Sequence, residues 1–298
     1  MKQKYETIIF KGIANQLIEV INEIIADYAA DNLVLTVRQL YYVLVTRNVI
    51  KNDDKEYKRL ASIVNRARLA GLIDWDMIED RTRRFRGLSR WDSAGQILRS
   101  AAHSFHMDMW QNQKTRCFCI VEKEALYGVL SRVCGKYDIP LLAARGYPSS
   151  SVLHDFVTNL VLPNRDQHIN IIHLGDHDPS GIDMTRDLQE RIMVFCEGKV
   201  PEISLTRVAL NMDQIEEKRP PPNPAKMTDS RVGNYIAQYG NQSWELDALE
   251  PRYLENLIVE DIEQYIDSDE WQYTETYTEH FRQRLVEASK DFDGKHKD

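Results

Sequence analysis

The sequence is poor in cysteine and contains no long apolar run. It has four cysteines in 298 residues, and charged residues interrupt every hydrophobic stretch before the about 20 apolar residues that a membrane-spanning helix needs. The first residues also lack the layout of a secretory signal. These absences predict no membrane partner and favour the reducing cytoplasm, where cysteines stay free thiols.

Two sequence motifs are also missing. No cysteine or histidine pair has the spacing of a zinc site, so the cysteines are interpreted as core thiols. No Gly-x-x-x-x-Gly-Lys-[Ser/Thr] phosphate loop is present, so the chain is not expected to hydrolyse ATP itself. The formal net charge of -8 argues against indiscriminate nucleic-acid binding, although it says little about local patches.

The most informative segment joins a short apolar run to two carboxylates. The run begins at Ile171, and Asp176 and Asp178 follow it directly, before a turn that ends at Gly181. Because residues i and i+2 of a strand point to the same side, we expect both carboxylates to project together from a strand end. Converging carboxylates at the carboxyl end of a buried strand suit a hard cation, here Mg²⁺ with Mn²⁺ as a substitute.

A second apolar run, over residues 116–121, ends in Glu122 and precedes a helical stretch. Two strand–acid–helix units predict an α/β fold with a parallel sheet whose strand ends gather Glu122, Asp176 and Asp178 around the metal. The alternative is that each acid merely caps the helix that follows it. The set of three favours metal binding. Three further acids are candidates to support the site from outside the ligand set: Glu124, Asp183 and Glu245.

Apolar residues at helical spacing predict three helices before the first strand, over residues 13–30, 37–47 and 55–70. Residues 72–75 then open a candidate wing or hairpin. Three helices and a wing form a helix-turn-helix type of DNA-binding module.

The charge of this module differs from that of the whole chain. Between Lys55 and Arg90 there are ten basic and five acidic side chains, an excess of five positive charges. Ordinary solvated charges are the alternative, but the arginine cluster favours contacts with DNA phosphates, which Arg binds in bidentate fashion. The candidate DNA contacts are Lys58, Arg59, Arg81, Arg83, Arg84 and Arg86.

Two adjacent tyrosines, Tyr41 and Tyr42, lie in the helix expected over residues 37–47, shortly after Arg38. One interpretation is core packing with the hydroxyls tied to neighbours. The other is covalent catalysis, in which a tyrosyl oxygen attacks a phosphodiester. Because a free tyrosine has a pKa of about 10, the attack needs help, and Arg38 could stabilise the charge on the phosphate.

Five motifs, in the same order along the chain, resemble those of the A subunit of topoisomerase VI and the related meiotic double-strand-break proteins. They are Arg38-Gln-Leu-Tyr-Tyr42, Val121-Glu-Lys-Glu-Ala125, Gly146-Tyr-Pro148, Asp176-His-Asp-Pro-Ser-Gly181 and Glu245-Leu-Asp-Ala-Leu249. The resemblance covers about residues 30–260, and the short chain resembles the reduced "mini-A" form. Gln39 stands where the family has an acid. The proline-rich residues 218–225 have no counterpart that we can place in the larger enzymes, and they are expected to form a loop without regular structure, because proline removes N–H donors and fixes φ. These departures leave open whether strand passage occurs.

The resemblance implies a domain organisation. A winged-helix domain that carries the tyrosine would span residues 1–91, and a helical connector residues 92–114. A Toprim domain, which is a Rossmann-like parallel sheet that binds metal, would span residues 115–298 and include a C-terminal helical extension.

The resemblance also implies the chemistry. Tyr42 would be the nucleophile, Arg38 would stabilise the transition state, and Glu122 with the two aspartates would hold Mg²⁺. In a homodimer, Tyr42 of one protomer would cut double-stranded DNA at the metal of the other and leave 5'-phosphotyrosyl ends. A complete topoisomerase would need a separate ATPase subunit, and the expected location is the cytoplasm, at the nucleoid.

Two other functions remain open from the residues. A Toprim nuclease would keep the acids and the metal but use water as the nucleophile. A non-catalytic DNA-binding protein would bind DNA without cutting it.

Overall fold

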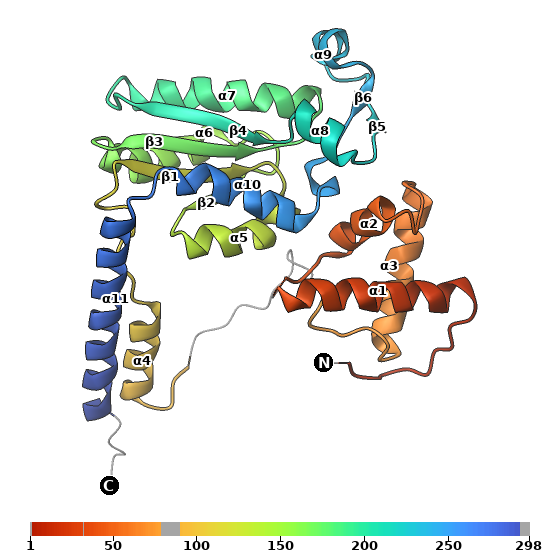
Figure 1. Cartoon of the computed structure of the whole chain (residues 1–298), viewed down its shortest axis with the longest axis horizontal. Coiled ribbons are helices and arrows are strands. Elements are labelled where there is room, and N and C mark those ends of the chain that lie inside the picture. Colours follow the sequence, from red (N-terminus) through yellow and green to blue (C-terminus); the bar gives the residue numbers. More distant parts are fainter. Residues whose placement is uncertain (1, 32, 79–89, 293–298) are drawn as a thin grey trace.

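The computed structural model describes residues 2–31, 33–78 and 90–292 and has two parts (Figure 1). The first part is a group of helices: α1 (Ile13–Ala30), α2 (Val37–Thr46) and α3 (Asp54–Leu69). The second part is built on a four-stranded sheet: β1 (Thr115–Val121), β2 (Leu141–Ala143), β3 (His168–Leu174) and β4 (Ile203–Ala209). Its longer helices are α4 (Ala94–Ser104), α5 (Tyr127–Lys136), α6 (Ser150–Phe156), α7 (Pro179–Cys196), α8 (Met212–Lys218), α9 (Val232–Tyr239), α10 (Pro251–Glu263) and α11 (Ser268–Ser289).

The three N-terminal helices begin and end within about one residue of the predicted bounds. Helix α2 begins with a capping box, in which the Thr36 hydroxyl accepts from the Gln39 N–H and the Gln39 side chain accepts from the Thr36 N–H. Gln39, which departs from the family pattern, therefore serves the start of this helix. Apolar residues of all three helices, including Ile21, Leu40 and Leu60, form a common core.

The predicted wing is not confirmed. Over residues 71–78 the chain makes turns and one isolated bridge, between Leu35 and Ile78, and no hairpin strands occur in this described stretch. Four of the candidate DNA contacts fall outside the described residues: Arg81, Arg83, Arg84 and Arg86.

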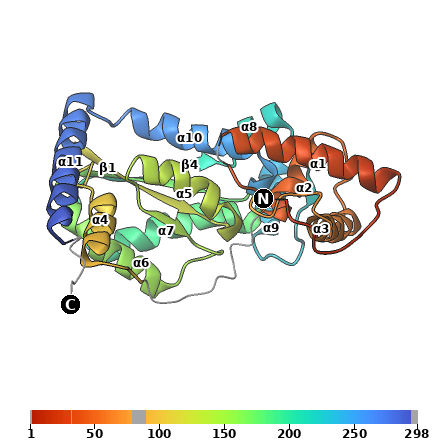
Figure 2. The same ribbon diagram turned by 90° about the horizontal axis from the view of Figure 1, so that it is seen from below.

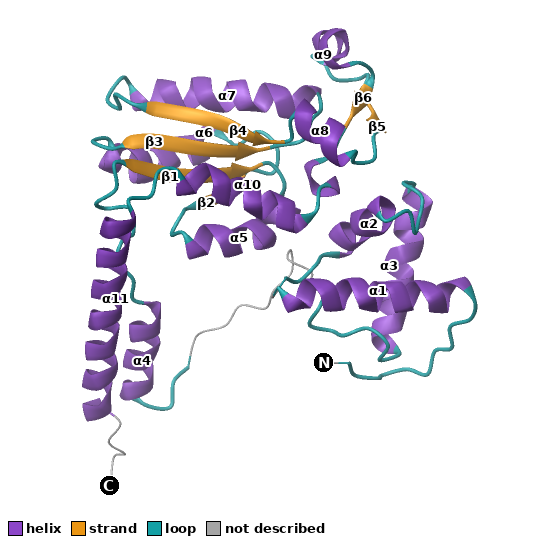
Figure 3. Ribbon diagram, viewed as in Figure 1, coloured by secondary structure: helices purple, strands orange, loops and turns teal. Residues whose placement is uncertain are grey.

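The sheet has the order β2-β1-β3-β4, and every pair of neighbouring strands is parallel (Figure 3). Helices α5 and α10 pack on one face of the sheet and α6 and α7 on the other, so both faces are covered (Figures 1 and 2). The α/β fold with a parallel sheet is therefore confirmed, and it is compatible with a Rossmann-like domain. All four cysteines are buried free thiols.

The strand order creates a switch point between β1 and β3. The chain passes from β1 outward to β2 on one side and then returns to β3 on the other side. Crevices outside the carboxyl ends of such strands are where open α/β sheets bind ligands. The residues that follow β1 and β3 are therefore the ones placed to form a site.

The expectation that residues 218–225 contain no regular structure is wrong in part. Lys218 is the last residue of α8, and Asn223–Pro224 form the short strand β5, which pairs antiparallel with β6 (Gln242–Ser243). The pairing tolerates Pro224 because a two-residue edge ribbon needs few N–H donors, and the next donor, the Ala225 N–H, bonds to the Asn241 carbonyl at 2.9 Å.

Helices α4 and α11 pack side by side at the end of the molecule opposite α1–α3 (Figures 1 and 2). Helix α11 confirms the predicted terminal helix after Asp267. No helix of the described residues combines the length and the apolar character needed to cross a membrane.

Candidate functional site

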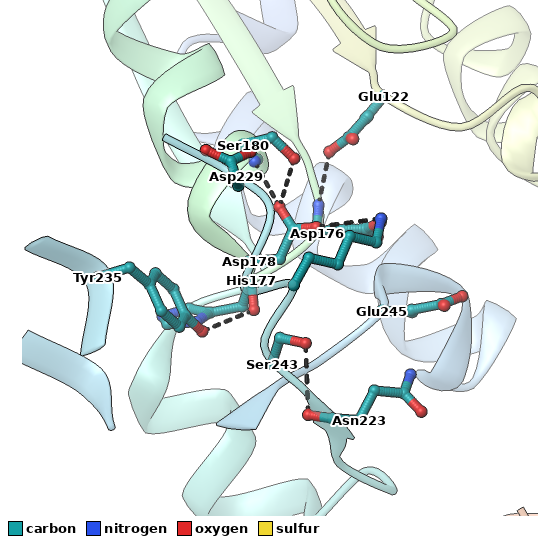
Figure 4. Close-up of polar contacts among 12 residues, drawn as sticks. Glu122, Asp176, His177, Asp178, Ser180, Asn223, Asp229, Tyr235, Ser243 and Glu245 are labelled. Carbon is teal, nitrogen blue, oxygen red and sulfur yellow. Dashed lines mark hydrogen bonds and ion pairs between the residues drawn. The ribbon is translucent and has the colours of Figure 1, made fainter. Parts of the chain in front are cut away.

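Glu122, Asp176 and Asp178, here called the strand-end acids, come together at the switch point (Figure 4). Glu122 directly follows β1, and its Oε2 accepts a hydrogen bond of 2.9 Å from the Asp176 backbone N–H. The ends of β1 and β3 therefore bring Glu122 beside the Asp176 backbone, but the local geometry differs from the predicted one. Strand β3 already ends at Leu174, so the two aspartates lie in a loop, and it is the backbone bridge between His177 and Trp244 that shapes this loop.

Asp178 combines the two roles that the sequence left as alternatives. Its Oδ1 caps α7 by accepting from the Gly181 N–H at 2.7 Å and from the Ser180 hydroxyl at 2.8 Å. Pro179 stands in the first turn of the helix, where no N–H is needed. The second oxygen, Oδ2, lies 3.9 Å from Lys226 Nζ. The capping role therefore leaves one carboxylate oxygen directed toward a cation.

The backbone of this loop is held very closely. A Cβ atom at Gly181 would stand 2.2 Å from the Asp176 carbonyl oxygen, so only glycine fits there. Arg207 of β4 donates to the Gly175 carbonyl at 2.8 Å and to the Asp176 carbonyl at 2.6 Å. Burial lowers the pKa of Arg207 to about 10, although nearby carboxylates oppose that shift. Arg207 therefore fixes the loop that carries the acids.

Burial makes Glu122 and Asp176 reluctant to ionise. It raises the pKa of Asp176 to about 7, although Lys123 opposes the shift, and Glu122 adds to it. Burial also raises the pKa of Glu122, and the charge of Asp178 adds to that rise. Buried negative charge without sufficient balancing cation is the physical origin of both shifts.

A hard divalent cation would suit this donor set. Carboxylates are the ligands that Mg²⁺ prefers, and the raised pKa values of Glu122 and Asp176 show that a further positive charge beside them would be favourable. Within the described ranges, however, no three His, Cys, Asp or Glu side chains stand close enough together to form a ready metal site. The donors therefore fit the ion in chemistry, and binding would require the carboxylates to move closer together.

Glu245 and Asp247, here called the bridging acids, join the helical part to the sheet. They lie at the short helix η4 (Leu246–Ala248) before α10. Arg38 of α2 forms an ion pair with Glu245 and another, at 2.8 Å, with Asp247. Lys123 Nζ lies 2.9 Å from Glu245, 2.8 Å from Asp247 and 3.1 Å from Asp176. Lys123 therefore connects the bridging acids to the strand-end acids.

The two adjacent tyrosines have different environments. The Tyr41 hydroxyl donates to Asn52 Oδ1 at 2.9 Å and accepts from the Asp53 N–H at 2.7 Å, which ties down the loop before α3. The Tyr42 hydroxyl instead donates to Glu245 Oε2 at 2.9 Å. Of the two tyrosines, Tyr42 is therefore the one whose hydroxyl contacts a bridging acid.

A cleft of about 320 Å³ lies between the two parts of the molecule. Residues from both parts line it, among them Arg38, Tyr42, Asp176, Asp178, Lys226 and Glu245. The predicted nucleophile, its arginine and two predicted metal ligands therefore open onto one space within a single chain.

The ionisation states of Tyr42, Glu245 and Lys123 are shifted by burial and by their charged neighbours. Burial raises the pKa of Tyr42 well above its usual value, and Asp247 and Glu245 add to the rise, so the phenol is held neutral. Burial also disfavours the charge of Glu245, but Lys123 and Arg38 outweigh it and lower the pKa of Glu245 to about 2. Burial opposes the charge of Lys123, yet the surrounding carboxylates raise its pKa overall. Tyr42 is thus a protonated donor to a firmly ionised carboxylate.

Two of the supporting acids that the sequence suggested are engaged elsewhere. Glu124 forms an ion pair of 2.7 Å with Arg145. Asp183 accepts from the Tyr147 hydroxyl at 2.7 Å and pairs with Arg231 at 2.8 Å. Each carboxylate therefore has its own partners, whereas Glu245, the third candidate, reaches Tyr42.

The two described DNA-contact candidates lie on the exposed surface of α3. Arg59 forms an ion pair of 3.1 Å with Glu56, and Lys58 forms none with a described residue. The cation of Lys58 is therefore the more available of the two.

Sequence reasoning missed three charged residues of the site: Lys123, Arg207 and Lys226. A signal existed for two of them. Lys123 directly follows Glu122 within its motif, and Arg207 is a lone charge in an apolar strand. Lys226 carries no such local signal, because only the folded chain brings it to the cleft.

A scan against models of known protein families finds no match to this sequence, and a search of curated proteins likewise finds none.

Proposed function

We propose that this chain is a DNA-cleaving transesterase similar to the A subunit of type IIB topoisomerases. One observation carries the proposal: the hydroxyl of Tyr42 and the carboxylates of Asp176 and Asp178 open onto one cleft that also holds Arg38. A tyrosine, a guanidinium and a group of hard-ligand carboxylates are the parts that phosphodiester transesterification uses.

The proposed reaction exchanges one phosphoester bond for another. The Tyr42 oxygen forms a bond to a DNA phosphorus, and the bond from that phosphorus to the 3' oxygen breaks. The 5' end of the DNA stays attached to Tyr42 as a phosphodiester, the phenolic proton leaves, and the 3' oxygen takes up a proton. Resealing is the reverse reaction, so no oxidant or energy source is needed for cleavage itself.

DNA entry would change the partners of the cations. Arg38 and Lys123 now hold the bridging acids, and a DNA phosphate offers the same kind of oxygen ligands. Exchange of carboxylates for phosphate would free Tyr42 from Glu245. It would also leave both cations beside the charge that develops on the phosphate. Glu245, with a pKa of about 2, is a poor proton acceptor, so its release favours the attack.

The metal would be held by the strand-end acids, Glu122, Asp176 and Asp178. When bound, Mg²⁺ or Mn²⁺ would supply positive charge for the phosphate and the leaving oxygen. The homodimer and the separate ATPase subunit that the resemblance implies belong to the same proposal. In the single chain, the Tyr42 hydroxyl bonds to Glu245 and opens onto the cleft that Asp176 and Asp178 of the same chain also line, so the site that we propose does not require the tyrosine of a partner.

The test is incubation of the purified chain with supercoiled plasmid and Mg²⁺ or Mn²⁺. The DNA is denatured with detergent, with and without protease, and separated on a gel. We expect nicked or linear DNA whose ends carry protein until protease removes it, and we expect chelation by EDTA to abolish cleavage. Tyr42→Phe should remove the covalent adduct, and Tyr41→Phe, the matched control, should keep it. Cleavage by Tyr42→Phe at the parental rate with an adduct still present would refute Tyr42 as the nucleophile.

A metal-dependent nuclease that uses water is the second candidate. The observation in its favour is that Tyr42 is neutral, has a raised pKa and is bonded to Glu245, which makes it a weak nucleophile as it stands. The same gel separates the two reactions, because hydrolysis cuts DNA without leaving attached protein and would survive in Tyr42→Phe. A non-catalytic DNA-binding protein would shift the DNA on a native gel and show no cleavage with either metal.

A further inference from the structure

Residues 220–243, here called the arm, extend from the sheet part beside the cleft (Figures 1 and 3). The arm consists of the ribbon of β5 and β6 and the helix α9 between them. Asn223, Pro224, Lys226 and Ser243 of the arm line the cleft. The chemistry proposed for Tyr42 gives the arm no role, although its proline-rich beginning is a departure of this chain from the larger enzymes that it resembles.

One face of α9 packs its tyrosines on His177, the residue between the two aspartates of the strand-end acids. The ring centroids of Tyr235 and Tyr239 lie 5.6 and 4.7 Å from that of His177, and both contacts are edge-to-face. Trp244, which directly follows β6, contacts the same ring at 5.8 Å. Edge-to-face contacts between such rings are favourable. His177 is therefore enclosed by the arm and its base, and it is only 2% exposed.

The hydroxyl of Tyr235 holds both the side chain and the backbone of His177 (Figure 4). It lies 2.8 Å from His177 Nδ1, 2.8 Å from the His177 carbonyl oxygen and 3.0 Å from the Gln242 carbonyl oxygen. Carbonyl oxygens only accept, so the single proton of the hydroxyl goes to a carbonyl, and the hydroxyl accepts from the Nδ1–H of His177. Because Tyr235 is only 4% exposed, losing the hydroxyl would leave its partners buried and unpaired.

The position of His177 sets the course of the loop that carries the two aspartates. Asp176 and Asp178 are its neighbours in the chain, so a rotation of the His177 backbone would displace both carboxylates. The His177 N–H and carbonyl are also paired with the backbone of Trp244, at 2.8 and 2.9 Å. Partners that orient metal ligands in this way typically change metal affinity by about 10- to 100-fold when they are removed.

We propose that Tyr235 is a positioning residue for a divalent cation at the strand-end acids, so that the arm and the cation stabilise each other. Tyr235 acts through His177, which it holds at two points. The coupling is reciprocal: if the arm strengthens cation binding, the bound cation holds the arm more firmly by the same free energy. This coupling rests on the metal of the proposed function, and it adds control of that metal by a segment outside the ligand set.

The test is titration of the full-length chain with Mn²⁺ without DNA, in which the paramagnetic resonance signal of the free ion measures binding. We expect Tyr235→Phe to weaken binding about tenfold, since the ring keeps its packing and only the hydroxyl is lost. Tyr239→Phe is the matched control and should bind Mn²⁺ like the parent, because within the described part of the chain the Tyr239 hydroxyl makes no hydrogen bond. Circular dichroism checks that each variant is folded, and Asp176→Asn identifies the ion bound at the strand-end acids.

Hydrogen exchange of α9 measures the reciprocal effect. Mn²⁺ should slow the exchange of the amides of residues 232–239 in the parent, and the slowing should be much smaller in Tyr235→Phe at the same Mn²⁺ concentration. The parental response decides the question even if Tyr235→Phe does not fold. Parental Mn²⁺ affinity in a folded Tyr235→Phe chain, or exchange in α9 that does not respond to Mn²⁺, overturns the proposal and leaves the cleavage chemistry standing. A parent that binds no Mn²⁺ would refute the metal of the proposed function and this coupling with it.

Discussion

The strand-end acids and the bridging acids lie close to one cleft, which Asp176, Asp178 and Glu245 line, but they differ in how their charge is balanced. Burial raises the pKa of Asp176 to about 7, and it raises the pKa of Glu122 as well. Glu245 is also partly buried, yet Lys123 and Arg38 bring its pKa down to about 2. Burial alone therefore does not decide the ionisation of these groups: two cations, Lys123 and Arg38, contact Glu245, whereas Lys123 alone forms an ion pair with Asp176.

This difference separates two structural roles. The charges of the bridging acids are already balanced by Arg38 and Lys123, and these ion pairs hold α2 against the segment before α10. The strand-end acids retain charge that a cation from outside could balance. Four predictions test this contrast, from the largest expected effect to the smallest.

Asp176→Asn should reduce cleavage by about 10³-fold, because it removes a carboxylate charge from the site and leaves the shape nearly unchanged. The amide oxygen can still accept from the Leu246 N–H, which bonds to Asp176 Oδ1 at 2.7 Å, so the free energy of unfolding should change by less than about 1 kcal/mol. Single-turnover cleavage and urea unfolding measure the two effects. The control is Asp183→Asn, the same change outside the cleft, which should cleave like the parent. If the D176N variant cleaved DNA at the parental rate, the Asp176 carboxylate would have no role in cleavage.

Asp247→Asn should lower the free energy of unfolding by about 3 kcal/mol, because it removes the buried carboxylate that pairs with Lys123, whose own side chain is only 18% exposed. The Asp247 side chain is completely buried, whereas that of Glu245 is 29% exposed. Glu245→Gln should therefore cost less, about 1 kcal/mol, since solvent screens its partners. Urea unfolding compares the two variants. Equal losses in both would mean that burial does not set the strength of this contact.

Asp178→Ala and Asp178→Asn should separate capping from charge. Alanine removes the cap of α7 and should cost about 1 kcal/mol, whereas asparagine is a good capping residue and should cost almost nothing. Both variants lose the carboxylate, so both should lose cleavage. Thermal unfolding measures the cap. If the asparagine variant regained cleavage, Asp178 would act only as a helix cap.

Lys58→Ala should weaken DNA binding about threefold and reduce the slope of log affinity against log salt by about one. Arg59→Ala should do less, because its charge is already paired with Glu56. Fluorescence titration with a labelled duplex at several salt concentrations measures both. A larger effect from Arg59 would contradict the rule that a cation already paired with an acid has less to offer a phosphate.

Much of the fold could be predicted because its periodicity is local. The apolar spacing of residues 13–30 gave the bounds of α1, and the apolar runs before Glu122 and Asp176 gave β1 and β3. Helices α8 and α9 were not predicted, since they are short and their stability depends on packing against distant segments. The strand β5 escaped notice because proline suggested a loop, and its pairing partner β6 lies some twenty residues later.

The residues of the site could be predicted only where an acidic residue comes at or just after the end of a predicted strand. The parallel sheet brings the ends of β1 and β3 together, so Glu122 and Asp176 could be placed from their motifs. The contact of Tyr42 with Glu245 spans 203 residues of sequence, and no local pattern encodes it. The involvement of Lys123 and Asp247 likewise follows from the way α2 rests on the loop before α10.

The fit of Gly181 has a consequence for how this turn can change over time. A Cβ atom there would stand 2.2 Å from the Asp176 carbonyl oxygen, so no other amino acid can replace this glycine while the backbone keeps its present conformation. The residues around it can vary with their surroundings. Glycine at 181 is thus a fixed landmark by which a far-diverged chain with the same turn could be aligned to this one.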